Sequence, residues 1–103
     1  MGEDEAARLF HALSNADRLS IIRRLVVAGP QGLSAGDIAQ GLGASASRAS
    51  FHLAALAEAG FIHRQRQSRS LRYTVDYSSI AALVSFLTHD CCRDSPELRA
   101  CRL

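Results

Sequence analysis

Apolar residues recur at helical spacing over two stretches near the start of the chain. The first stretch predicts a helix over 5–13, and the acidic residues before Leu9 suit its beginning. The second predicts a helix over 16–28, which follows a break and a new N-cap at Ser14-Asn15 and ends at Gly29-Pro30. Its predicted buried stripe comprises Leu19, Ile22, Leu25 and Val26.

Two shorter helices joined by glycines are predicted next. Ser34 is the expected N-cap of the first, and Asp37 stands where the partner of a capping box belongs. Glycines at the end of that helix mark a tight turn, and Ser45 is expected to cap a second helix that runs to about Ala59. The segment 34–60 therefore has the outline of a helix-turn-helix.

After residue 60 the apolar pattern changes from helical spacing to alternation. Two alternating stretches separated by a polar turn predict a β-hairpin, or wing, over 61–76, with Tyr73 in the core. A last helix is predicted over 78–92, followed by a tail over 93–103. The apolar face of this helix comprises Ile80, Leu83, Val84 and Leu87.

These elements predict a mainly α fold with a β-hairpin wing, a single winged helix-turn-helix domain over 1–103 with five helices. The last helix is more apolar than an outer helix of a lone monomer needs. A chain of 103 residues also buries only a modest core by itself. Both features favour a homodimer.

Composition and the distribution of apolar residues indicate where in the cell the protein is located. Hydrophobic residues make up 48% of the chain, which argues against intrinsic disorder. No apolar run approaches the roughly 20 residues that cross a bilayer. The N-terminus is acidic and lacks the basic start of a signal peptide. We therefore expect a cytoplasmic protein with no membrane partner.

The positive charge is unevenly distributed. The net charge is only +2, yet four arginines fall in the predicted wing with no acidic residue among them: Arg64, Arg66, Arg69 and Arg72. A local basic stripe on a near-neutral domain indicates binding to a polyanion, although a solvated hairpin would show the same cluster. Beside a helix-turn-helix, the expected polyanion is double-stranded DNA, with the arginines along its phosphates.

The second helix of the helix-turn-helix carries short polar side chains that suit the major groove of DNA. They are Ser45, Ser47, Arg48, Ser50 and His52. Arg48 is able to contact guanine with two hydrogen bonds. The alternatives are that Ser45 only caps the helix, that His52 touches a phosphate or sits at a packed edge, and that the whole face is simply solvated. A two-fold dimer would present two such helices one DNA turn apart, which predicts an imperfectly palindromic operator.

Three cysteines lie near the end of the chain: Cys91, Cys92 and Cys101. Cytosolic thiols stay reduced, so metal binding or redox sensing is expected before a structural disulfide. Adjacent α-carbons are about 3.8 Å apart, below the roughly 4.4–6.8 Å of an ordinary disulfide. Two neighbouring thiolates instead chelate a soft acceptor, and a third suits trivalent arsenic or antimony, whereas zinc prefers a fourth ligand. Chance occurrence near the terminus is the alternative, strongest for Cys101.

Three segments resemble the ArsR/SmtB family of bacterial metal-responsive repressors. They are LFHALSNADRLSIIRRL (9–25), SFHLAALAEAGFI (50–62) and RSLRYTVD (69–76). The resemblance implies a winged-helix repressor that dimerises through its first and last helices. The Cys-x-Cys pair of many relatives is missing from 33–37, and Ala46 stands where relatives often place a base-reading glutamine. Some relatives instead carry arsenite-binding cysteines at the C-terminal end.

Together, the residues and the resemblance predict a DNA-binding repressor that leaves its operator when C-terminal thiolates bind an inducer. The expected inducers are trivalent arsenicals, inorganic or methylated, and antimonite. By resemblance to zinc-sensing relatives, a zinc or cadmium site built from Asp76, His89 and Cys92 is a second hypothesis. A redox or persulfide sensor is a third, and a binding module without any ligand is a fourth. No enzyme or catalytic cofactor is expected, because no oxyanion-hole motif accompanies the His89/Cys92 pair.

Overall fold

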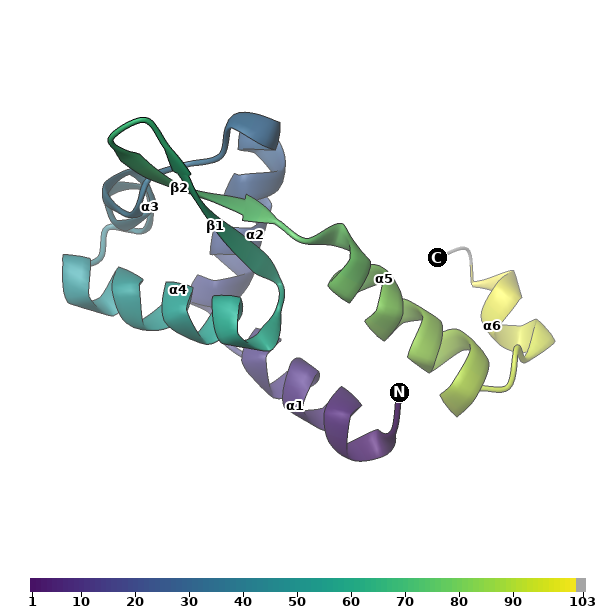
Figure 1. Cartoon of the computed structure of the whole chain (residues 1–103). Coiled ribbons are helices and arrows are strands. Elements are labelled where there is room, and N and C mark those ends of the chain that lie inside the picture. Colours follow the sequence, from purple (N-terminus) through teal and green to yellow (C-terminus); the bar gives the residue numbers. More distant parts are fainter. Residues whose placement is uncertain (102–103) are drawn as a thin grey trace.

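The computed structural model describes residues 1–101 as helices around one two-stranded hairpin (Figure 1). A 3-10 turn, η1 (Gly29–Gln31), follows the second helix, and a π-helical turn, η2 (Phe86–Cys91), follows the fifth. The helices and strands are α1 (Glu3–Leu13), α2 (Ala16–Ala28), α3 (Ala35–Leu42), α4 (Ala46–Ala59), β1 (Ile62–Gln67), β2 (Ser70–Val75), α5 (Tyr77–Ser85) and α6 (Pro96–Ala100).

The five predicted helices are present within the described residues, and their ends differ from the prediction mainly near the C-terminus. The helix expected over 78–92 is α-helical only to Ser85 and continues as the π-helical turn η2. The segment expected to be a plain tail contains α6, a helix of 5 residues that begins at Pro96. Proline suits this position because the first N–H groups of a helix have no acceptor within it.

The predicted N-caps are confirmed. The side chain of Asn15 accepts hydrogen bonds from the first turn of α2. Ser34 and Asp37 form the reciprocal capping box of α3, and Ser45 accepts from the backbone N–H of Arg48 at 3.1 Å. Each cap satisfies N–H groups that have no acceptor inside the helix, so these short polar residues define where the helices begin.

The turn between α3 and α4 depends on a glycine. Gly43 has φ +64°, a left-handed conformation that residues with a side chain rarely adopt, and its N–H closes the end of α3. The chain then enters α4 through Ser45. This turn gives α3 and α4 the arrangement of a helix-turn-helix (Figure 1).

The core lies where α1, α2 and α4 meet the base of the hairpin. Its largest fully buried side chains are Phe61, Ile21, Leu25, Ile38, Leu53 and Leu56. The predicted stripe of α2 is wrong in part, because Ile21 is buried while Leu19 and Val26 are 49% and 45% exposed. Apolar residues surround much of α2, so periodicity alone did not distinguish the core face from its neighbours.

The wing is an antiparallel pair whose register runs from Ile62 opposite Val75 to Gln67 opposite Ser70. Leu33, just before α3, exchanges backbone hydrogen bonds with Tyr73, of 3.2 and 2.9 Å. Tyr73 is buried, as predicted. An isolated hairpin is marginal in water, so this link and the buried Tyr73 attach the wing to the helix-turn-helix.

The molecule is elongated, with principal extents of 48 × 24 × 22 Å. Figure 1 shows α5 leading away from the wing toward α6, while α3 and α4 lie at the opposite end. Among residues 1–101, no helix is long and apolar enough to cross a membrane.

Candidate functional site

The outer face of α4 is exposed along most of its length. Its exposed stripe has i, i+3, i+4 and i+7 spacing and consists of Ser47, Ser50, Phe51 and Ala54. The opposite stripe lies in the core and includes Ala49, Leu53 and Leu56. The serines predicted to face outward do so. Phe51, which the sequence reasoning did not select, lies on the same face, and helical spacing from Ser47 would have identified it.

His52 was predicted on this face, and that prediction is wrong. Its side chain is buried, with a residue exposure of 6%. Arg18 Nε donates a hydrogen bond to His52 Nδ1 at 3.1 Å, and His52 Nε2 lies 3.4 Å from Asp17 Oδ2. An arginine only donates, so Nδ1 carries no proton and the Nε2–H faces Asp17. Three residues after Ala49 and four before Leu56, His52 falls on the core side of α4.

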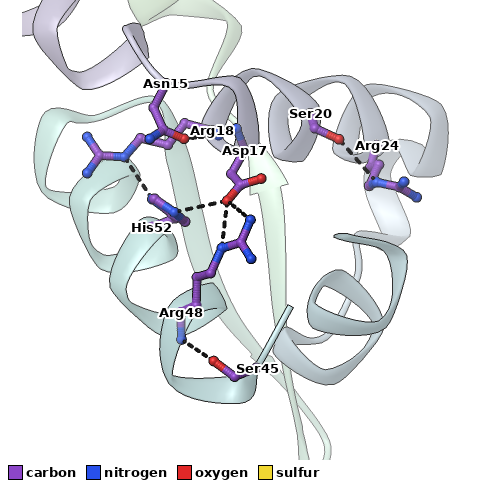
Figure 2. A network of polar contacts seen from close by, with 8 residues as sticks. All are labelled: Asn15, Asp17, Arg18, Ser20, Arg24, Ser45, Arg48 and His52. Atoms are coloured by element: carbon purple, nitrogen blue, oxygen red, sulfur yellow. Dashed lines mark hydrogen bonds and ion pairs between the residues drawn. The ribbon is translucent and has the colours of Figure 1, made fainter. Parts of the chain in front are cut away.

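Arg48 is exposed but already has a partner. Its Nε and Nη2 both donate to Asp17 Oδ2, at 2.8 and 2.5 Å (Figure 2). The Arg48 side chain is 52% exposed and that of Asp17 is 23% exposed. An exposed ion pair of this kind contributes about 0–1 kcal/mol. Asp17 therefore restrains Arg48 without holding it permanently against α2.

These contacts form one polar network between α2 and α4. Figure 2 shows Asp17 between Arg48 and His52, with Arg18 on the other side of the His52 ring. Arg18 also donates through Nη1 to the carbonyl of Ala12 in α1, at 3.3 Å. The network thus fixes how α4 lies against α2 and α1, and its members come from segments more than 30 residues apart.

The register of the hairpin divides the wing arginines between two faces. Arg64 lies opposite Tyr73 and Arg66 opposite Leu71, so both arginines share a face with those apolar residues. Arg72 lies on the other face, where its Nη1 is 3.8 Å from Asp37 Oδ2 of α3. The sequence has no acidic residue among the four arginines, and the fold brings Asp37 of α3 close to one of them. Arg64, Arg66 and Arg69 are exposed.

Cys91 and Cys92 lie at the end of η2, and both are free thiols. Cys91 is exposed and Cys92 is half-buried. The pKa of Cys92 is raised above its ordinary value, first by desolvation and then by the like charge of a neighbouring Cys91 thiolate. Cys91 also lines an open cleft of about 770 Å³ shared with the start of α1, lined by Met1, Gly2, Glu3, Asp4, Glu5, Phe86, Asp90 and Cys91.

The structure does not bring Cys101 to this pair. The Cys101 thiol donates to the carbonyl of Glu97, one turn back in α6, at 3.4 Å. Arg93 and Asp94, which connect η2 to α6, both have positive φ, and this bend sets the direction of α6. Among residues 1–101, no three His, Cys, Asp or Glu side chains are grouped to hold a metal ion. The predicted three-thiolate site is therefore not assembled within one chain in this arrangement.

The predicted zinc ligands are also apart within one chain. Asp76 caps the start of α5 and lies 3.0 Å from Nε2 of His63 in β1. His89 lies beyond the other end of α5 and hydrogen-bonds to Asp94. Each of the two side chains thus has a partner of its own.

A helix-turn-helix with an exposed second helix, followed by an arginine-bearing hairpin, defines a winged-helix DNA-binding protein. A helix-turn-helix domain family matches residues 13–65, about half of the chain. The chain is 33% identical over 89 residues to the HTH-type transcriptional regulator YgaV of Escherichia coli (strain K12), covering 86% of this chain and 88% of that protein. It is 31% identical over 81 residues to a probable mercury resistance operon repressor of Streptomyces lividans, covering 79% of this chain and 62% of that protein.

Solved structures agree with these relatives. An ArsR-like transcriptional regulator from Rhodococcus sp. RHA1 superposes with a TM-score of 0.78 at 26% identity, over 96% of this chain and 91% of that one. A homodimeric winged helix-turn-helix domain from Mycobacterium bovis, a possible ArsR-family regulator, superposes with a TM-score of 0.66 at 25% identity, over 84% and 82% of the two chains. The chain belongs to the ArsR/SmtB family of winged-helix transcriptional regulators.

Proposed function

We propose that this regulator is a homodimeric repressor that binds an imperfectly palindromic operator and leaves it when thiols of Cys91 and Cys92 bind an inducer. Trivalent arsenicals and antimonite are the proposed inducers. The observation that carries the sensing half of the proposal is the pair of adjacent free thiols at the end of η2, one exposed and one half-buried.

The proposed DNA interface combines α4 and the wing. The major groove admits one helix, and the exposed stripe of α4 with Ser47 and Ser50 has the shape and polarity to enter it. Arg48 reaches a guanine only by leaving Asp17, which costs little at this exposure. The wing contacts phosphates through its exposed arginines Arg64, Arg66 and Arg69. The half-buried Arg72 contacts a phosphate after it has left Asp37.

The proposed dimer forms along α1 and the α5–η2 arm. Val84 and Leu87 of this arm are 50% and 39% exposed, and Phe10 of α1 is 39% exposed. Apolar side chains at such exposure are stabilised by covering them with a second copy. The Mycobacterium bovis relative described as homodimeric supports this assembly. A two-fold dimer presents two α4 helices, and its operator therefore repeats the half-site with two-fold symmetry.

The chemistry of the cysteine pair favours an arsenical over a divalent ion. Two thiols condense with arsenous acid so that two S–H and two As–OH bonds break, two As–S bonds form and two waters leave, with no change in oxidation state. This condensation releases no net proton, so the raised pKa of Cys92 does not oppose it. A divalent ion displaces the thiol protons instead, and the raised pKa weakens its binding.

The third arsenic bond distinguishes two forms of the inducer. A methylated arsenical has two open valences, which Cys91 and Cys92 satisfy. Arsenite and antimonite have a third valence, and we propose that Cys101 takes it after α6 shifts. Arg93 and Asp94, which connect η2 to α6, are exposed, and the Arg99–Asp94 pair spans 3.9 Å, so few side-chain contacts hold α6 in place. We propose that this shift of α6 transmits inducer binding to the dimer interface along α1 and the α5–η2 arm.

A second candidate inducer is divalent mercury. It is a soft ion that suits thiolate ligands, and Cys91 and Cys92 provide two of them without Cys101. The relative described as a probable mercury resistance operon repressor supports this alternative. Zinc or cadmium bound by Asp76, His89 and Cys92 requires those residues to leave their present partners, or to meet across the dimer.

The test is release from DNA. A duplex selected by the wild-type protein from a random-sequence library carries a fluorophore, and anisotropy follows dissociation on adding arsenite, methylarsenite, antimonite, mercury(II), zinc or cadmium. We expect release by the arsenicals and antimonite, with a coupling of about 1–3 kcal/mol. The double variant Cys91→Ser/Cys92→Ser should bind the duplex normally and no longer respond. Release of the double variant by an arsenical would refute the thiol site. Release of the wild type by mercury or zinc alone would show that this ion is the inducer and that the arsenicals are not.

A further inference from the structure

Phe51 is the one large apolar side chain on the exposed stripe of α4. It is 65% exposed, although a phenylalanine buries a large apolar area when the fold offers it a place in the core. Its neighbours on the stripe are Ser47 and Ser50, which are exposed and polar. Within the described residues its side chain contributes little to the core, so most of the ring is accessible to a ligand that meets this face of α4.

The ring of Phe51 is held in position by fixed groups. The Arg18 guanidinium carbon lies 5.6 Å from the ring centroid, a cation–π contact. The His52 ring stands edge-on to it, with centroids 5.5 Å apart and planes at 65°. Arg18 and His52 are themselves joined by the 3.1 Å hydrogen bond of the α2–α4 network. An exposed ring supported in this way loses little conformational freedom when it meets a ligand.

The chemistry of the major groove offers one apolar feature on the base edges, the C5-methyl group of thymine. Serine hydroxyls and arginine suit the hydrogen-bonding groups of the groove, whereas a phenyl ring suits only that methyl group. We propose that Phe51 reads thymine in each operator half-site through an apolar contact with the C5-methyl group. This assigns a specificity-determining role to a residue among the polar side chains of α4.

The inference rests on the proposed placement of α4 in the major groove. The two ideas fail differently. If the wild-type chain selects no preferred sequence from a random duplex library, the interface itself is wrong. If it selects a sequence but no thymine methyl group matters, only the role of Phe51 is wrong.

The experiment removes the methyl group alone. Duplexes with the selected sequence are prepared with deoxyuridine replacing thymidine at one position at a time, symmetrically in both half-sites, and affinities are measured by anisotropy without inducer. Burying one methyl-sized group is worth about 0.8 kcal/mol, or about fourfold in affinity for each half-site. We expect at least one thymine position per half-site to show this loss with the wild-type protein. Phe51→Ala should bind the parent duplex more weakly and be indifferent to deoxyuridine at that position.

The controls separate this contact from a general loss of binding. Val27→Ala changes a residue that is 88% exposed on α2, and it should keep both the affinity and the deoxyuridine effect of the wild type. If Phe51→Ala binds too weakly to measure, Phe51→Leu is scanned instead and should show a reduced methyl effect. A wild-type scan that is flat at every thymine overturns the proposal, as does a Phe51 variant that keeps the full deoxyuridine effect.

Discussion

The two ends of this molecule differ in how firmly the helical segments that carry the functional side chains are held. At the α2–α4 end, Asp17, Arg18, Arg48 and His52 form a connected network beside a buried core. At the other end, no residue from Val84 to Cys101 is buried, and Cys101 and the Asp94 pairs are exposed.

The contrast fits the proposed function, in which the α2–α4 end binds DNA and the C-terminal end binds an inducer. A helix that reads base edges needs a fixed orientation, because each contact depends on its position in the groove. A segment that responds to a ligand needs two arrangements close in energy, and such segments are drawn from the less stable parts of a structure. Variants at each end of the molecule test this contrast.

The largest effect concerns the loosely held end. Cys101→Ser should weaken the release of DNA by arsenite and antimonite by more than about tenfold, the equivalent of about 1.4 kcal/mol. Methylarsenite should be unaffected, because its two open valences are satisfied by Cys91 and Cys92. Anisotropy titrations of wild type and variant on one duplex measure both. An equal response of the variant to all three compounds would show that α6 does not move to complete the site.

The firmly held end should be sensitive to loss of its buried ring. His52→Ala leaves Arg18 Nε without its acceptor, so the free energy of unfolding should fall by about 1–3 kcal/mol. Chemical denaturation monitored by circular dichroism measures the change. The matched control is His63→Ala, whose side chain is 57% exposed, and it should stay within about 0.5 kcal/mol of the wild type. Equal effects of the two changes would mean that the network adds nothing to stability.

The wing should act through charge alone. Replacing both Arg66 and Arg69 with alanine should weaken binding to all sequences alike and lower the slope of log affinity against log salt by about 2, or about 1 for each lost phosphate contact. Arg99→Ala, on exposed α6, should leave the slope unchanged. DNA affinities of the wild type and both variants at several salt concentrations give the three slopes. If both variants had the same salt slope as the wild type, Arg66 and Arg69 of the wing would make no contact with DNA phosphates.

The smallest expected effect is a pH dependence at the start of α5. Hydrogen bonds from Ser78, first of all that of its side chain, hold the pKa of Asp76 below its ordinary value, with a smaller contribution from His63. Asp76 thus stabilises the fold above its unfolded-state pKa of about 3.9, and this contribution disappears as the pH falls through the lower folded-state pKa. Asp76→Asn should be less stable than the wild type near neutral pH, and the difference in urea midpoint should close in strong acid. A difference independent of pH would assign the effect to shape rather than charge.

The sequence by itself determined the local features of this protein. Asn15, Ser34 with Asp37, and Ser45 cap the helices that they were predicted to cap, since a cap bonds to N–H groups two or three residues away. The helix-turn-helix, the wing and the adjacency of Cys91 and Cys92 follow from equally short-range patterns. The resemblance to the family was likewise visible in contiguous segments of the chain.

Only the tertiary structure decided which distant residues meet. Asp17 and Arg48 are 31 residues apart, and Arg18 and His52 are 34 apart, so no local pattern could predict that His52 would be buried and Arg48 paired. The same holds for Ile21 replacing Leu19 in the core, and for α6 keeping Cys101 away from Cys91 and Cys92. Hydrogen bonds within one turn depend on local sequence, whereas contacts between elements depend on how whole faces pack, and several faces of this chain are apolar enough to compete.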